Sequence, residues 1–151
     1  MRFGRIVILA LLWALAGAGA AGTEKYAPVI TPYVESDAQK QQMAKASEAY
    51  DKGDYETTKR LLAPLVEAGH PKAINAIGLM HDYGFRYDKD EMLACELYEK
   101  AALKGYASAQ WNTSICYAQA GGKNKFKRKR LYWLELAADN GNESAQVRMA
   151  A

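Results

Sequence analysis

The chain has 151 residues with a mean hydropathy of −0.32, and its 20 basic and 17 acidic side chains nearly balance. This length provides one domain of ordinary size. The balance of charge excludes a nucleic-acid binder, which would carry a basic face along its length.

Residues 1–21 have the order of a secretory signal peptide. Arg2 and Arg5 give a basic start, an eleven-residue apolar run follows from Ile6 to Ala16, and Ala18-Gly19-Ala20 offers a cleavage site. A spanning helix needs about 20 apolar residues, so this run is too short for a membrane anchor. The cleavage region contains no cysteine, so we do not expect a lipoprotein anchor. We expect export, and a soluble periplasmic or secreted chain after cleavage.

Residues 22–36 have no helical period and contain Pro28 and Pro32, so we expect an extended leader. From Asp37 onward, small and apolar residues recur at steps of three and four, which predicts a helix over residues 37–51. Gly53 suits the left-handed end of that helix, and Asp54 suits the N-cap of the next one.

Three glycines, Gly69, Gly105 and Gly141, stand 36 residues apart, and each follows a helix-like stretch of small and apolar residues. A fixed period of this length is typical of repeat arrays, whose units bury their apolar faces only against one another. No stretch alternates with period two, so we predict an all-α chain. Its units are residues 37–69, 70–105 and 106–141, and residues 142–151 form a short cap.

The repeats resemble Sel1-like repeats, the 36-residue relatives of tetratricopeptide repeats. The first full copy matches at Ala73, Ile77-Gly78, Met80, Gly84, Asp90, Ala94, Tyr98, Lys100-Ala101-Ala102 and Gly105. The second copy matches at Ala107, Ala109-Gln110, Tyr117, Trp133, Ala137-Ala138 and Gly141. Residues 53–69 look like a degenerate first unit. The resemblance implies a right-handed α-solenoid of antiparallel helix pairs, with a groove lined mainly by the first helix of each pair.

Chemistry for catalysis is not evident in the sequence. His70 follows Gly69 at a turn and suggests a capping role, and His81 takes a core position usually held by tyrosine. No metalloprotease, serine-hydrolase or phosphate-loop motif appears. Asp88, Asp90 and Glu91 suggest a solvated turn with a helix cap more than a cation site. We therefore predict no enzyme, no catalytic residues, no metal and no cofactor.

Two sets of residues are candidates for partner contacts. Phe85, Tyr87 and Trp111 depart from the core pattern of the repeat, and tyrosine and tryptophan often anchor interfaces; the alternative is that they pack over the loop between helices. The second set is a basic stretch, where six cations stand against a net charge of −5 for the rest of the chain after residue 21. The six are Lys123, Lys125, Lys127, Arg128, Lys129 and Arg130. We take Lys125, Lys127, Arg128 and Lys129 as candidate contacts, and a solvated loop is the alternative.

Cys95 and Cys116 flank the turn at Gly105 almost symmetrically, so an antiparallel hairpin would bring them to the same height. An oxidising compartment favours a disulfide between them. Two buried free thiols are the alternative, because cysteine packs well as a small apolar residue. Some secreted Sel1-like proteins carry a disulfide across this hairpin nearer the positions of Ala102 and Gln110.

The sequence therefore predicts an exported, non-enzymatic adaptor that holds a protein partner in its groove and loops. The partner would have an acidic surface, and weak contact with anionic lipid is a further expectation for the basic stretch. The resemblance leaves two alternatives. One is an immunity protein that neutralises a secreted antibacterial effector such as a lipase; the other, more remote, is binding or hydrolysis of β-lactams or cell-wall fragments.

Overall fold

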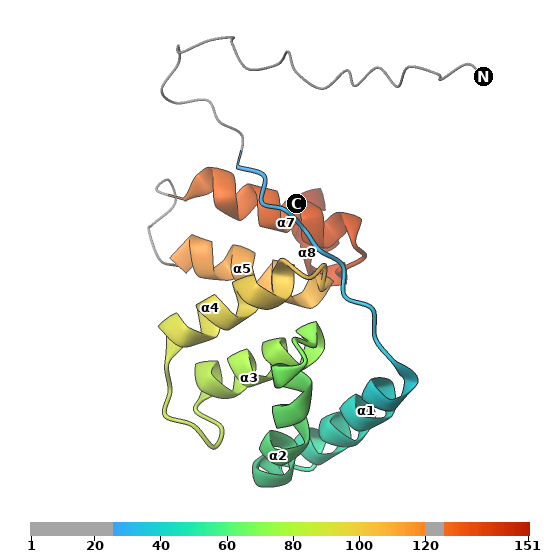
Figure 1. Cartoon of the computed structure of the whole chain (residues 1–151). Coiled ribbons are helices and arrows are strands. Elements are labelled where there is room, and N and C mark those ends of the chain that lie inside the picture. Colours follow the sequence, from blue (N-terminus) through green and yellow to red (C-terminus); the bar gives the residue numbers. More distant parts are fainter. Residues whose placement is uncertain (1–25, 120–125) are drawn as a thin grey trace, which may run out of the picture.

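The structure is a computed structural model, and it describes residues 26–119 and 126–151. Within these ranges it contains seven helices and no strand. They are α1 (Asp37–Asp51), α2 (Tyr55–Glu67), α3 (Pro71–Tyr83), α4 (Glu91–Ala102), α5 (Ala107–Gln119), α7 (Lys127–Asp139) and α8 (Glu143–Ala150). Helices pack as the pairs α1–α2, α3–α4 and α5–α7, and α8 packs on α7 (Figure 1). The predicted all-α repeat fold is confirmed.

The glycine period has a direct structural meaning. Gly69, Gly105 and Gly141 each follow the second helix of a pair, and their φ angles are 74°, 84° and 85°. Residues with a Cβ rarely adopt this left-handed conformation, so glycine lets the chain reverse at the same place in each unit. The repeat in the sequence is thus a repeat of turns.

Side-chain caps fix where most of the helices begin. Ser36 forms a capping box with Gln39 at the start of α1. Asp54, His70, Asp90 and Asn142 cap α2, α3, α4 and α8 by accepting the backbone N–H three residues on. Each cap satisfies a donor that the first turn of a helix leaves unpaired. By contrast, Phe126 at the start of α7 gives no such hydrogen bond.

The core combines a few large side chains with many alanines. Trp133, Leu62, Ile74 and Met80 are fully buried. Alanines with no exposed surface lie where helices meet, and their small size lets neighbouring helices approach closely; they are Ala46, Ala73, Ala101, Ala102, Ala109, Ala137 and Ala145. The apolar positions that the repeat pattern predicts are therefore the positions that hold the pairs together.

Residues 26–36, named the N-terminal strap, contain no helix or strand, and they pack against the repeats. In Figure 1 the strap, the blue segment, runs from the level of α7 past α4 to the start of α1. The Thr31 backbone N–H donates to the Leu103 carbonyl at 2.8 Å, and Tyr26 and Ile30 join the core cluster around Trp133. The strap is a structural part of the array.

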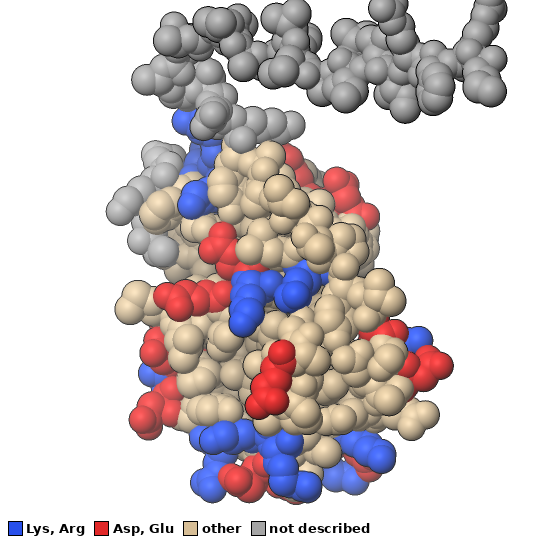
Figure 2. Space-filling view, viewed as in Figure 1, with Lys and Arg blue, Asp and Glu red and all other residues tan. Residues whose placement is uncertain are grey.

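Seen from the same side, Lys and Arg side chains form several small groups with acidic side chains nearby (Figure 2). No large surface of one sign dominates this face of the described residues. Nor is any helix in residues 26–119 and 126–151 both long and apolar enough to cross a membrane.

Candidate partner-binding groove

Three hollows lie in a row along the first helices of the pairs. The first is formed by α1, α2 and α3, the middle one by α3, α4 and α5, and the third by α5 and α8. Leu79 lines both the first and the middle hollow, and Trp111 lines both the middle and the third. Neighbouring hollows share a wall residue and therefore adjoin one another, and the row of three is named the partner groove.

The first hollow has a volume of about 160 Å³ and a mainly apolar lining. Its floor contains the buried Met43, Ala46 and Leu62. Two exposed charged residues of opposite sign, Asp51 and Lys72, also line it. This hollow can therefore accept an uncharged aliphatic or aromatic group.

The middle hollow has a volume of about 310 Å³ and a more polar lining. It contains the carboxylates of Asp82 and Glu91. The Tyr98 hydroxyl donates to Asp82 Oδ2 at 3.1 Å. Burial, and then the charge of Asp82, raises the pKa of Tyr98 well above its ordinary value, so the phenol stays a neutral donor to this carboxylate.

A disulfide joins Cys95 of α4 to Cys116 of α5, with 5.8 Å between the two Cα atoms. Of the two states that the sequence left open for these cysteines, the structure contains the bonded one. Both cysteines line the middle hollow. The bond therefore links the two helices of one wall at the place where the groove is most polar.

An amide pair connects the first helices of two successive units. Asn112 Nδ2 on α5 donates to Asn75 Oδ1 on α3 at 3.0 Å. Asn75 lines the first hollow and Asn112 the middle one, so this bond crosses the boundary between them. Asn75 and Asn112 stand at nearly equal distances after Gly69 and Gly105, and this is the signal in the sequence that marks them as a pair.

The three predicted aromatic contacts lie in two places. Trp111 lines the groove and also packs against the core cluster of α7 and α8, whereas Phe85 and Tyr87 pack against the core of the first pair and line none of the three hollows. Phe85 stacks on Tyr55 with 4.5 Å between ring centroids, and the Tyr87 ring lies 4.2 Å from that of His81. Phe85 and Tyr87 therefore hold the loop after α3 against the body of the fold, and their role in partner binding stays a prediction.

The candidate residues of the basic stretch also lie in different surroundings. Lys125 lies outside the described residues, and Lys127 and Arg128 are exposed in the first turn of α7. Lys129 is half-buried, and its Nζ lies 5.1 Å from the ring centroid of Tyr26 and 5.2 Å from that of Tyr117. Lys129 thus has an internal contact with the strap, whereas a partner contact for the stretch stays a prediction.

Around Tyr26 a polar cluster holds the first end of the strap. The hydroxyls of Tyr26 and Tyr117 both donate to Glu99 Oε1, at 3.1 and 3.0 Å. Trp133 Nε1 in turn donates to the Tyr26 hydroxyl at 3.2 Å. Burial and the neighbouring Glu99 carboxylate raise the pKa of both tyrosines, which keeps them protonated as donors.

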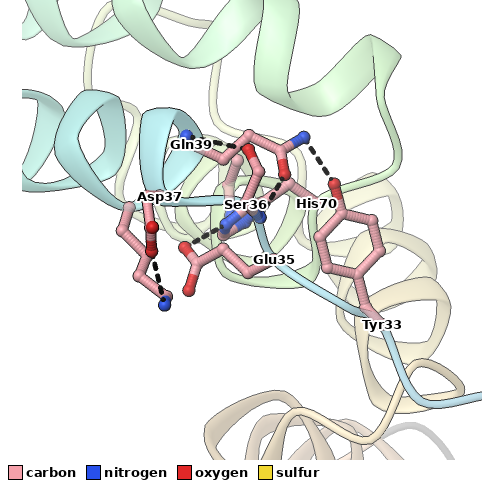
Figure 3. Close-up of polar contacts among 8 residues, drawn as sticks. Tyr33, Glu35, Ser36, Asp37, Gln39 and His70 are labelled. Atoms are coloured by element: carbon pink, nitrogen blue, oxygen red, sulfur yellow. Dashed lines mark hydrogen bonds and ion pairs between the residues drawn. The ribbon is translucent and has the colours of Figure 1, made fainter.

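The second end of the strap is held at His70, which is 2 % exposed. Its Nδ1 accepts the Ala73 backbone N–H, so its proton is on Nε2, which donates to Glu35 Oε1 at 2.6 Å (Figure 3). The Tyr33 ring lies beside the imidazole, and Gln39 Nε2 donates to the Tyr33 hydroxyl at 2.7 Å. Both nitrogens of His70 are thus engaged in structure, in agreement with the predicted capping role.

The packing of the strap against the repeats was not predicted from the sequence. Tyr26, Pro28, Ile30, Tyr33 and Glu35 are all partly buried, while most residues between them are exposed. The apolar and aromatic residues spaced through this segment are the sequence feature that indicates packing. Two prolines and the lack of a regular period made that packing hard to predict.

Comparison with known proteins agrees with the repeat assignment. The fold defines the class as a helical-repeat protein. The chain is similar to a Sel1 repeat protein from Oxalobacter formigenes of known crystal structure, with a TM-score of 0.63 and 29% sequence identity. The similarity covers 70% of this chain and 44% of the other, so the chain spans less than half of that protein. The predicted identity as a Sel1-like repeat protein is confirmed. No family model and no curated protein matches the chain.

Proposed function

We propose that this chain is an exported, non-enzymatic protein-binding module whose partner occupies the partner groove. The observation that carries the proposal is the row of three adjoining hollows, in which Leu79 and Trp111 are the shared wall residues. Half-buried apolar and aromatic side chains at the centre of a depression are the usual anchors of protein interfaces. The similarity to a Sel1 repeat protein also supports a protein-interaction role.

Two observations support export. The order of basic, apolar and small residues in 1–21 is that of a signal peptide. The Cys95–Cys116 disulfide suits an oxidising compartment, since disulfides are rare in the cytosol. Fractionation of cells that produce the chain with a C-terminal tag tests this part. Export predicts a shortened tagged product in the periplasm or medium, and a full-length product confined to the cytoplasm would contradict it.

The groove is tested by placing a charge in its wall. In Leu79→Lys the new ammonium group would stand where the first and middle hollows meet. Met92→Lys is the matched control, because Met92 is 76% exposed on α4 and does not line these hollows. Both variants are first compared with the original chain by circular dichroism and thermal unfolding.

The purified chains then capture partners from the periplasmic fraction of the source cell. We expect the original chain and Met92→Lys to retain the same partner and Leu79→Lys to lose it by tenfold or more, a change of about 1.4 kcal/mol. Equal retention by a folded Leu79→Lys would show that the partner binds elsewhere.

A further inference from the structure

We propose that the partner groove binds an extended peptide segment with an apolar side chain in the first hollow and a lysine or arginine side chain, about three residues away, in the middle hollow. This inference rests on the proposed function, because it assigns the chemistry of the partner to the same groove. It is carried by three features: the charges of the middle hollow, the lining of the first, and the amide pair between them.

The middle hollow is complementary to a cation. Among the described residues, its lining contains two carboxylates, Asp82 and Glu91, and no lysine or arginine. Trp111 and the 62% exposed Tyr83 line the same hollow. Aromatic faces attract ammonium and guanidinium groups and pack against their aliphatic stems. A basic side chain would therefore find both a charge partner and an apolar contact here.

One cation of the protein already lies close by. Lys89 Nζ is 2.7 Å from Glu91 Oε1, and the two side chains are 59% and 68% exposed. An ion pair this exposed contributes little free energy, because water solvates both groups, so a partner cation can replace Lys89. Asp82 is half-buried and receives the Tyr98 hydroxyl, and it is therefore the principal carboxylate of the site.

The amide pair between the hollows is suited to a peptide main chain. Asn75 is only 5% exposed, and its one side-chain hydrogen bond within the described residues uses its Oδ1. Within the described ranges, Asn75 Nδ2 has no protein acceptor and Asn112 Oδ1 has no protein donor. A peptide group offers one carbonyl acceptor and one N–H donor, which match these two atoms.

The spacing follows from the rise of α3, which lines both hollows. Lys72, Asn75, Ala76 and Leu79 of this helix line the first hollow, and Leu79, Asp82 and Tyr83 line the middle one. The two groups are centred about six residues apart, and an α-helix rises about 1.5 Å per residue, so about 9 Å separates them. An extended chain advances about 3.3–3.6 Å per residue, so the two anchors are about three residues apart.

Peptide display on the purified chain tests this assignment, with a library of ten randomised positions as the probe. We expect enriched peptides to share an apolar residue and a lysine or arginine about three positions away. The strongest peptide is then measured against Asp82→Asn/Glu91→Gln and against Glu96→Gln, a control on α4 that removes a charge outside the lining. Binding should fall tenfold or more in the double variant, with a reduced salt dependence, and stay within twofold in the control.

The outcomes separate the inference from the proposed function. Peptides that lose binding in Leu79→Lys but show no basic preference, or bind the double variant as well as the original chain, overturn the inference and leave the groove as the binding site. Enriched peptides that bind Leu79→Lys unchanged lie outside the groove and overturn both, as does the absence of any enriched peptide. Thermal unfolding of each variant identifies losses that come from misfolding.

Discussion

The groove side and the strap side of this protein are built from the same helix pairs and differ in what covers them. On the strap side, residues 26–36 lie over α4 and α7 and bring Tyr26 and Ile30 into the core cluster around Trp133. On the groove side, Trp111 lines two hollows that no segment of the described chain fills. The chain thus completes one side of its repeats with its own N-terminal segment and leaves the other side open to a partner.

Trp133 and Trp111 give the strongest test of this difference. Trp133 has no exposed surface, so Trp133→Ala should lower the free energy of unfolding by about 3–5 kcal/mol. Trp111 is half-buried and packs with one face against the core cluster of α7 and α8, so Trp111→Ala should cost less, about 1–2 kcal/mol, while reducing partner binding. Urea unfolding followed by circular dichroism measures both costs. Similar losses of stability in the two variants would mean that Trp111 contributes as much to the fold as Trp133 does.

Removal of the disulfide tests the groove side. Cys95 and Cys116 are 21 residues apart, and a loop of this size predicts a loss of about 3 kcal/mol in Cys95→Ser/Cys116→Ser. The loss arises mainly because the unfolded chain regains freedom. Urea unfolding of the oxidised chain, the reduced chain and the double variant checks this. Equal midpoints for all three would show that the bond contributes nothing to stability.

His70 tests the strap side, because it both caps α3 and anchors Glu35. His70→Ala removes both contacts and should cost about 2 kcal/mol. His70→Asn is the matched variant: asparagine can cap the helix but is too short to replace the whole imidazole contact with Glu35. We expect it to restore about half of the lost stability.

Limited proteolysis then reports on the strap itself. His70→Asn should be cut faster within residues 26–36 than the original chain, while the helices remain protected. Unchanged cleavage of the strap in both variants would show that Glu35 and His70 do not hold it.

The smallest expected effect is a loss of stability at alkaline pH. The folded state raises the pKa of Tyr26 and Tyr117, so it binds their protons more tightly than the unfolded chain does. The resulting stabilisation is complete below the ordinary tyrosine pKa of about 10 and is lost as the pH rises above it. Thermal unfolding at about pH 8 and about pH 11 should show a smaller alkaline decrease in Tyr26→Phe/Tyr117→Phe.

Tyr83→Phe is the control for this measurement, because Tyr83 is 62% exposed and lies away from Glu99. It should keep the full alkaline decrease. An equal decrease in the control and in the double variant would assign the effect to other groups.

Local signals in the sequence determined the helices and their turns. Gly53 and Asp54 mark the end of α1 and the start of α2, and the structure has both in these roles. The reason is that a cap or a left-handed turn is decided within a few residues, by a side-chain acceptor or by the absence of a Cβ. The same locality made the repeats visible as a period of 36 residues.

The candidate site was predictable only in part. Trp111, which the sequence offered as a groove residue on a first helix, does line a hollow, because position within a repeat fixes which face a residue occupies; its contact with a partner stays a prediction. The hollow with Asp82 and Glu91 was not foreseen. These carboxylates are nine residues apart in the sequence and meet only because α3 and α4 pack side by side.

Tertiary structure alone decided the strap, the bonding of the cysteines and the composition of the groove. Tyr26 contacts Trp133, 107 residues away, and Glu35 contacts His70, 35 residues away. No periodicity connects such pairs, since an extended segment has no helical face to mark its partner. The sequence by itself specified the units and their order, because those depend on neighbours along the chain; which surface closes and which stays open depends on contacts between distant segments.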